Sequence, residues 1–154
     1  MEDAGVPGLR AMCSSLLGRV ALEQGRHDDA EAAFETALAL SRQAGDSHGA
    51  GWATNQLGLM AYFRGALDAA DRLFEEALDL ARTAGDLALV KEAAIGLGYV
   101  REDRGNFGAA RGYYREALAV SRESGDRRGE AHTLMVIGET HRRSGELEAA
   151  RSFY

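Results

Sequence analysis

The sequence predicts an all-α fold, an α-α superhelix of antiparallel helix pairs with about seven helices and a truncated eighth. Two observations predict this fold. First, small, apolar and glycine positions recur every 40 residues without any insertion, and a period of that length is typical of stacked helical repeats. Second, the apolar residues inside each repeat are spaced i, i+3, i+4 and i+7, which places them on one face of an α-helix.

The repeat divides the chain into units of approximately residues 7–46, 47–86 and 87–126, followed by an incomplete unit at 127–154. We expect these units to form a single domain over residues 1–154. Glycines, alanines and aromatic residues define the register, and they are Gly18, Gly58, Gly98 and Gly138; Ala30, Ala70, Ala110 and Ala150; and Phe34, Phe74, Tyr114 and Tyr154.

Each unit contains two predicted helices, which we call helix A and helix B, and the second unit shows both. Its helix A carries a stripe of small and apolar residues at Thr54, Leu57, Gly58 and Ala61, spaced as one face of a helix. Gly65 ends this helix, because glycine readily adopts the left-handed conformation that closes a helix C-terminus.

Helix B of the second unit is predicted to begin near Leu67 and to have a charged outer face exposed to solvent. Gly85 ends this helix, and Asp86 can cap the next helix A. A glycine inside helix A, such as Gly58, costs about 1 kcal/mol relative to alanine. Close approach of helix B at Ala70 is the expected compensation. The apolar stripe of helix B comprises Leu67, Ala70, Phe74, Ala77, Leu78 and Ala81.

The combined pattern resembles the tetratricopeptide repeat, in its 40-residue variety with Gly-Asp between units. The motif is a small residue, Leu-Gly, Gly, Ala, an aromatic residue and Ala-Leu at these spacings, and it covers the chain from about residue 8 to the end. Arg42, Arg82 and Arg122 replace the family's proline after helix B, so helix B is predicted to run one turn longer. The family's first aromatic residue is also absent, and its place is taken by Ser14, Thr54, Ala94 and Leu134.

The resemblance implies a protein-interaction module whose A helices line a concave groove and whose B helices line the convex surface. The face of each helix A opposite to its packing stripe is therefore the expected partner-binding surface. A face meant only for water would not combine tryptophan, leucine, tyrosine and phenylalanine, and aromatic residues are common interface anchors. The predicted binding residues are Trp52, Asn55, Leu59, Tyr62 and Phe63 in the second unit, Glu92, Ile95, Tyr99, Glu102 and Asp103 in the third, and Met135, Glu139 and Arg142 in the fourth. The first unit offers Met12, Ser15, Arg19, Leu22 and Glu23 at the same positions.

Other interpretations stay open for this surface. Trp52 and Phe63 could instead pack against the neighbouring helix A. Family members that hold a partner's C-terminal carboxylate use Lys and Asn on helix A, and only isolated elements such as Asn55 match here, so an amphipathic helix or an extended peptide is the expected ligand. An alternative function is the sensory or regulatory repeat domain of a larger bacterial transcription regulator or signalling protein, by analogy at the level of the fold alone.

Composition argues against several classes of ligand and several cellular locations. The net charge of −6 argues against a nucleic-acid or anionic-membrane ligand. No segment has the roughly 18 consecutive apolar residues that span a bilayer, and the acidic N-terminus lacks the basic start of a secretory signal. We therefore expect a cytoplasmic protein. Cys13 is the only cysteine, which excludes an internal disulfide.

We expect no catalysis, no cofactor and no metal site. The acid pairs Glu75-Glu76 and Glu102-Asp103 are expected to be solvated faces of repeat helices rather than acid–base catalysts. The histidines lack the i, i+4 spacing of a helical zinc site and are expected at the surface. They are His27, His48, His132 and His141.

The end of the sequence carries a separate expectation. The last helix B begins near Leu147, and the sequence stops at Tyr154 about two turns later. A repeat array normally finishes with a helix whose outer face is polar. We therefore expect that the chain is a piece of a longer protein or that something else covers this end, and that isolated chains self-associate through it.

Overall fold

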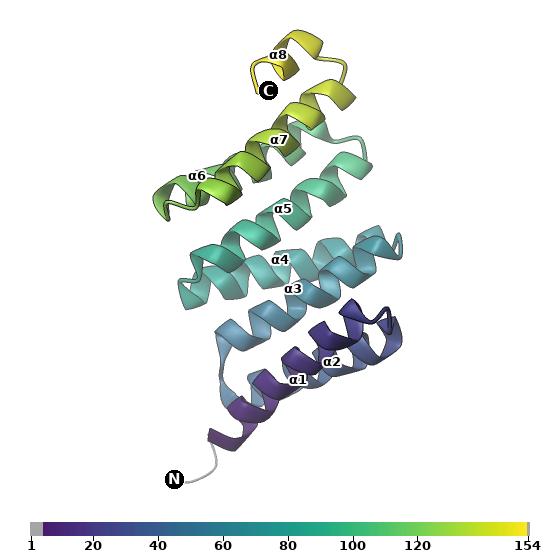
Figure 1. The fold of residues 1–154 in the computed structure, drawn as a ribbon, viewed down its shortest axis with the longest axis vertical. Helices are drawn as coiled ribbons and strands as arrows, with labels where there is room; N and C mark the ends of the chain where they lie inside the picture. Colours follow the sequence, from purple (N-terminus) through teal and green to yellow (C-terminus); the bar gives the residue numbers. More distant parts are fainter. Residues whose placement is uncertain (1–4, 154) are drawn as a thin grey trace. The chain divides into compact units, whose positions relative to one another are not determined.

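The computed structural model describes residues 5–153, and within this range the chain forms eight α-helices and no β-strand (Figure 1). The predicted all-α helical repeat is confirmed. Each helix A is followed by an antiparallel helix B, and the last B helix is short. The helices are α1 (Gly5–Glu23), α2 (His27–Ala44), α3 (Ser47–Phe63), α4 (Leu67–Ala84), α5 (Leu87–Asp103), α6 (Phe107–Glu123), α7 (Arg127–Arg143) and α8 (Leu147–Arg151).

Local chemistry sets the helix ends as predicted. Gly45 follows α2 with a φ of 68°, a left-handed conformation that glycine adopts without a steric penalty. Asp46 then caps α3, and its carboxylate accepts a hydrogen bond from the Gly49 amide at 2.9 Å. Helix α2 ends at Ala44, two residues past Arg42, so helix B runs about half a turn beyond the family's proline position rather than the full turn that we predicted.

The chain divides into two compact units, each larger than one 40-residue repeat, and each has its own core. From here on, the first and the second unit mean these two compact units. The first unit ends at Asp86 and contains α1–α4, in which α1 packs on α2, α2 on α3 and α3 on α4. Its buried core joins Phe34 of α2 to Leu57 and Met60 of α3, with the half-buried Trp52 packed against them.

The second unit begins at Leu87 and contains α5–α8. Within it, α5 packs on α6, α6 on α7 and α7 on α8. Tyr114 and Leu118 of α6 form a buried cluster with Val136 and Ile137 of α7, and the half-buried Tyr99 of α5 packs against this cluster.

The glycines inside the A helices pack against an aromatic ring rather than against the expected alanine. A Cβ on Gly58 would lie 2.9 Å from the ring of Phe74, and a Cβ on Gly98 would overlap Cε1 of Tyr114. Both rings are fully buried. The expectation that Ala70 makes the closest approach is therefore corrected, because the longer aromatic side chain of helix B reaches across to helix A.

Candidate functional site

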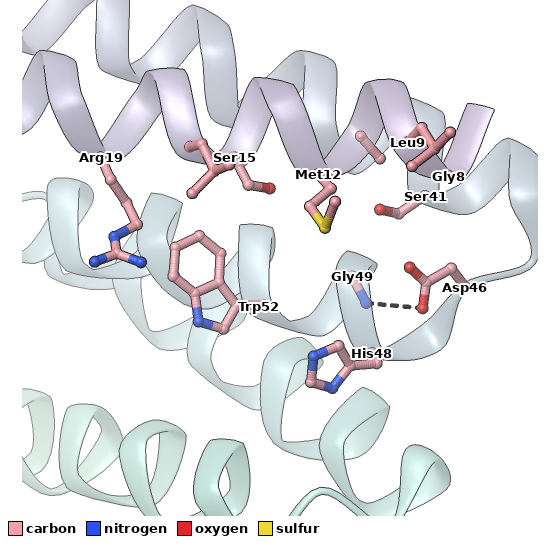
Figure 2. Close-up of a pocket in the computed structure, with 12 residues that line it drawn as sticks. Gly8, Leu9, Met12, Ser15, Arg19, Ser41, Asp46, His48, Gly49 and Trp52 are labelled. Carbon is pink, nitrogen blue, oxygen red and sulfur yellow. Dashed lines mark hydrogen bonds between the residues drawn. The ribbon is translucent and has the colours of Figure 1, made fainter. Parts of the chain in front are cut away.

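The predicted stripe of the second repeat borders a groove between α1 and α3, and this groove lies within the first compact unit. One hollow of about 430 Å³ lies at the N-terminal half of the two helices and has a mainly apolar lining. Figure 2 shows Met12 and Arg19 extending from α1 toward Trp52 on α3. A second hollow of about 490 Å³ lies beside the C-terminal half of α3, where Leu59 and Phe63 contribute to its wall.

Trp52 has two roles in this groove. Its ring meets the buried ring of Phe34 edge-on, with centroids 6.0 Å apart, so part of the indole belongs to the core. The rest of the side chain lines the first hollow together with Met12, which is 57% exposed. Packing and lining the groove are therefore compatible for this residue.

The exposed end of the stripe is aromatic. Phe63 is 81% exposed, and its ring meets the half-buried ring of Tyr62 edge-on at 5.7 Å. Beside the same hollow, Arg64 is held by Glu31 of α2 at 2.7 Å. An apolar surface with a fixed charge at its rim can receive a ligand that has both apolar and charged groups.

Asn55 lies in the interior rather than on the groove surface. It is only 3% exposed, and within residues 5–153 its Oδ1 atom is buried with no hydrogen-bond partner. A buried amide oxygen without a partner is costly, and the structure offers no physical account of it.

In the second unit the predicted residues divide between surface and core. Glu92 is exposed, whereas Ile95 is buried in the cluster around Tyr114. Tyr99 is half-buried, and its ring meets that of Tyr114 at 6.0 Å. Burial raises the pKa of the Tyr99 hydroxyl, and the nearby carboxylates of Glu102 and Glu92 raise it further.

Glu102 is the clearest correction in the second unit. We expected a solvated acidic residue, but it is 4% exposed and its carboxylate links three helices. It accepts hydrogen bonds from the Tyr114 hydroxyl at 2.9 Å, from the Thr140 hydroxyl at 3.2 Å and from the Arg143 guanidinium at 2.8 Å. Periodicity placed Glu102 on the predicted groove face of α5, but it could not show that polar residues of α6 and α7 cover that position.

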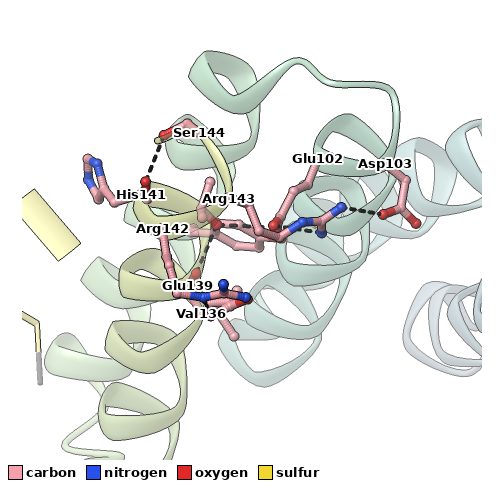
Figure 3. A network of polar contacts seen from close by, with 10 residues as sticks. Glu102, Asp103, Val136, Glu139, His141, Arg142, Arg143 and Ser144 are labelled. Atoms are coloured by element: carbon pink, nitrogen blue, oxygen red, sulfur yellow. Dashed lines mark hydrogen bonds and ion pairs between the residues drawn. The ribbon is translucent and has the colours of Figure 1, made fainter. Parts of the chain in front are cut away.

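Arg143 connects this buried carboxylate to the surface (Figure 3). Burial alone would lower the pKa of its guanidinium, but the charges of Glu102 and Asp103 raise it overall. Asp103 itself is exposed and lies 3.4 Å from Arg143. The acidic end of α5 is therefore partly neutralised by α7 within the same unit.

The predicted residues of α7 lie near the surface. Met135 is 52% exposed and Glu139 is half-buried. Arg142 is exposed and forms an ion pair with Glu139 one helical turn away, with Nε at 2.8 Å from Oε2 (Figure 3). Ion pairs near the protein surface contribute little stability.

One histidine differs from its expected surface position. His141 is 9% exposed, its Nδ1 lies 2.8 Å from the Glu146 carboxylate, and its ring stacks on Phe153 at 5.4 Å. The contact with His141 is the main cause of a lowered pKa for Glu146. No group of three His, Cys, Asp or Glu side chains placed to hold a metal ion occurs within residues 5–153.

The sequence pattern missed part of the groove wall. Leu9 and Leu16 of α1 line the first hollow and are 62% and 52% exposed. Their counterparts 40 residues later are Gly49 and Gln56. Large apolar side chains at positions where the next unit has a glycine and a glutamine are the signal that could have identified them.

Comparison with known proteins decides the family. A model of the tetratricopeptide repeat matches residues 10–83 and 89–154. The chain belongs to the tetratricopeptide repeat family. No curated protein sequence matches the chain. None of the helices within residues 5–153 is long and apolar enough to cross a membrane.

Solved structures show the same tetratricopeptide fold at low sequence identity. The chain is similar to BtubC from P. vanneervenii (21% identity, TM-score 0.84, 96% of this chain and 61% of that one). It is also similar to aspartyl phosphate phosphatase F from Bacillus subtilis (13% identity, TM-score 0.85, 93% of this chain and 38% of that one). A putative kinesin light chain of Podosopora anserina with nearly identical TPR-like repeats matches as well (14% identity, TM-score 0.71, 94% of this chain and 71% of that one). The chain thus spans less than two thirds of the first two structures, and these likenesses show the fold. The tetratricopeptide repeats themselves support a protein-interaction repeat module.

Proposed function

We propose that this tetratricopeptide repeat chain binds a peptide or a partner protein in the groove lined by its A helices, without catalysing a reaction. The observation that carries the proposal is the exposed apolar wall between α1 and α3. Phe63 and Met12 stand at its two hollows with 81% and 57% of their surface exposed. Exposed apolar surface bordered by polar residues is typical of interaction sites.

The proposed ligand is an amphipathic helix or an extended peptide with apolar anchors. The hollow beside Trp52 suits one large apolar side chain, and Arg19 at its edge suits an acidic neighbour of that side chain (Figure 2). The second unit carries predicted binding residues of its own at its surface: Glu92, Asp103, Met135 and Arg142 are exposed, and Glu139 is half-buried. Asn55, Ile95 and Glu102 are left out of the proposed contact surface because all three are buried. We place the protein in the cytoplasm.

The test begins with affinity capture by the purified chain and by its variants. Replacing Phe63 and Met12 by alanine removes exposed apolar surface without opening the core, so the variant should keep its thermal stability within about 0.5 kcal/mol. Binding of any captured partner should weaken by about 2 kcal/mol or more if these residues are anchors. Tyr99→Ala is a poorer test, because Tyr99 also packs against the core of the second unit.

Fluorescence and a control variant separate this groove from other surfaces. Trp52 is the only tryptophan, so its emission should change when the captured partner is titrated into the chain. Asp79→Ala, on the exposed face of α4, should leave binding unchanged. A partner that leaves the Trp52 emission unaffected and binds the Phe63 and Met12 variants normally, yet is lost in the Asp79 variant, would overturn the proposal.

A further inference from the structure

The first hollow, between α1 and α3, has a carboxylate at one end. Asp46 lines it at the start of α3, and its Oδ1 atom accepts the hydrogen bond from the Gly49 amide at 2.9 Å. His48 also lines the hollow, but its Nδ1 lies 2.7 Å from the carboxylate of Asp86. Arg19 lies at the far end of the hollow from Asp46 (Figure 2). Within residues 5–153, neither His48 nor Arg19 forms an ion pair with Asp46.

The second unit contains the equivalent hollow, between α5 and α7. It measures about 250 Å³, and every residue that lines it lies two repeats after a residue that lines the first hollow. In this register Lys91 corresponds to Ala11, and Asp126 corresponds to Asp46. The two hollows are therefore two versions of one site, and their differences can be compared residue by residue.

In the second unit, a lysine of the chain itself pairs with the carboxylate. Nζ of Lys91 lies 2.6 Å from Oδ2 of Asp126, while Oδ1 of Asp126 accepts the hydrogen bond from the Gly129 amide at 2.8 Å. Glu92 adds a second carboxylate, 3.7 Å from the same ammonium. The hydrogen bond to Asp126 is the main cause that raises the pKa of Lys91 above its ordinary value of 10.5. The contact therefore favours a charged amine.

The first unit keeps the carboxylate but lacks the lysine. Its Ala11 side chain ends at Cβ and carries no charge, and Met12 replaces Glu92. The hydrogen bond between the capping carboxylate and the helix amide is the same in both units, so Oδ2 of Asp46 corresponds to the oxygen that meets the ammonium of Lys91. The first hollow is also the larger of the two, as expected where a lysine side chain is replaced by a methyl group.

We propose that the first hollow receives a lysine side chain of the peptide ligand, whose ammonium pairs with Asp46 as that of Lys91 pairs with Asp126. The stem of this lysine lies along Leu9 and Met12, because lysine buries its methylene groups against apolar surface and keeps its charge at a polar partner. The net charge of −6 speeds the association of such a basic ligand. The inference rests on the proposed groove, and it names a ligand residue that this groove selects.

The first test places a lysine in the chain itself. Ala11→Lys adds this side chain at the position that corresponds to Lys91, and Ala11→Met is the matched uncharged change. Asp46→Asn should lower the melting temperature of the Ala11→Lys variant by about 2 °C or more, because it removes the partner of the new ammonium. The same change should leave wild type and the Ala11→Met variant nearly unaffected, since asparagine caps a helix as well as aspartate. Circular dichroism shows whether each variant folds.

The second test supplies the lysine on a peptide. Acetyl-Lys-Leu-Glu amide is titrated into the intact chain at low salt and compared with acetyl-norleucine-Leu-Glu amide, which keeps the apolar stem but lacks the ammonium. The emission of Trp52 reports occupancy, because its side chain lines the hollow. The lysine peptide should bind wild type about fivefold more tightly than the norleucine peptide. This preference should vanish in Asp46→Asn and in Ala11→Lys, where the carboxylate is removed or already paired.

The possible outcomes separate the lysine inference from the groove proposal. Equal binding of the two peptides to wild type, or a lysine preference that survives in Asp46→Asn, would overturn the inference and leave the groove in place. An Ala11→Lys variant that Asp46→Asn does not destabilise would overturn it too, and so would one that fails to fold where Ala11→Met folds. If neither peptide changes the Trp52 emission, the groove proposal loses support together with the inference.

A third peptide identifies the source of the amine. Norleucine-Leu-Glu amide with a free N-terminus carries an ammonium on its backbone rather than on a side chain. Tighter binding of this peptide than of the lysine peptide would show that a peptide N-terminus occupies the hollow, which would overturn the assignment to lysine. Weaker binding is the expected result, because the Lys91 contact in the second unit is made by a side chain.

Discussion

At the scale of single residues, the ring of Tyr114 limits what position 98 can hold. A Cβ there would overlap Cε1 of that buried ring. Alanine would gain about 1 kcal/mol of helix propensity, but the Tyr114 ring is fully buried, and overpacking costs about 1–3 kcal/mol. We expect Gly98→Ala to lower the free energy of unfolding by about 1 kcal/mol, measured by urea denaturation. Gly58→Ala, with its closest contact at 2.9 Å, should lower it less.

Gly112 is the matched control for that substitution. It lies inside α6, it is exposed, and a Cβ there would meet no atom within 4 Å. Gly112→Ala should therefore stabilise the protein by up to about 1 kcal/mol through helix propensity alone. Equal effects of the Gly98 and Gly112 substitutions would show that the ring contact does not limit packing in α5.

The buried carboxylate of Glu102 gives a second prediction at the residue scale. Glu102→Leu removes the acceptor that the Tyr114 and Thr140 hydroxyls share and the counter-charge of Arg143. Losing one side of a buried polar contact costs about 1–3 kcal/mol, which should appear as a lower urea midpoint. The double variant Glu102→Leu, Tyr114→Phe should lose less unfolding free energy than the sum of the losses in the two single variants, because the two side chains share one hydrogen bond.

Asp103 provides the control for Glu102. It is exposed and approaches Arg143 only at 3.4 Å, so Asp103→Ala should change the free energy of unfolding by less than about 0.5 kcal/mol. Strict additivity of the Glu102 and Tyr114 substitutions would argue against a shared network.

At the scale of helices, the start of α7 should depend on pH. Asp126 caps α7 through the Gly129 amide at 2.8 Å and also lies 2.6 Å from the Lys91 ammonium of α5. The hydrogen bond from Lys91, followed by that from Gly129, lowers the pKa of Asp126 below its ordinary value of 3.8. A carboxyl whose pKa is lowered by folding stabilises the protein fully above its unfolded pKa and loses this contribution as pH falls through the folded value. Thermal unfolding of wild type and Asp126→Asn should therefore differ at pH 7, and the difference should shrink as the pH falls below 3.8.

Asp46 makes the matched comparison possible. It caps α3 in the same way, but Ala11 stands where the second unit has Lys91. Asparagine is as good an N-cap as aspartate, so Asp46→Asn should leave the melting temperature nearly unchanged at every pH. A pH-dependent difference of the same size for both aspartates would assign the effect to the cap rather than to Lys91.

Helix ends could be predicted from the sequence because local residues determine them. Gly45 and Asp46 specify the turn between α2 and α3 by their own backbone preferences and hydrogen bonds, with no contribution from distant residues. The burial of Ile95 and Glu102 could not be predicted in this way. Periodicity identifies the face of a helix on which a side chain lies, but which residues of neighbouring helices cover that face depends on their reach and polarity.

At the scale of the whole chain, the family matches and the compact units agree on one boundary. The first segment that matches the family ends at residue 83, and the second begins at residue 89. The two compact units meet between them, at Asp86 and Leu87. Trp52, Leu59 and Phe63 could be placed beside the hollows along α3, because helical periodicity puts them on the face opposite to the packing stripe of that helix. The exposure of Leu17 could not be predicted, because Leu17 falls at a position that is buried in the later repeats.

The junction between repeats also determines how the number of repeats can change in evolution. Each junction has a left-handed glycine followed by aspartate, as at Gly45-Asp46 and Gly125-Asp126. Recombination between two copies of the repeat, in frame and in register, would add or remove whole units while rebuilding the same turn and the same cap. The number of units can therefore vary by duplication or deletion of gene segments without a new type of connection between helices.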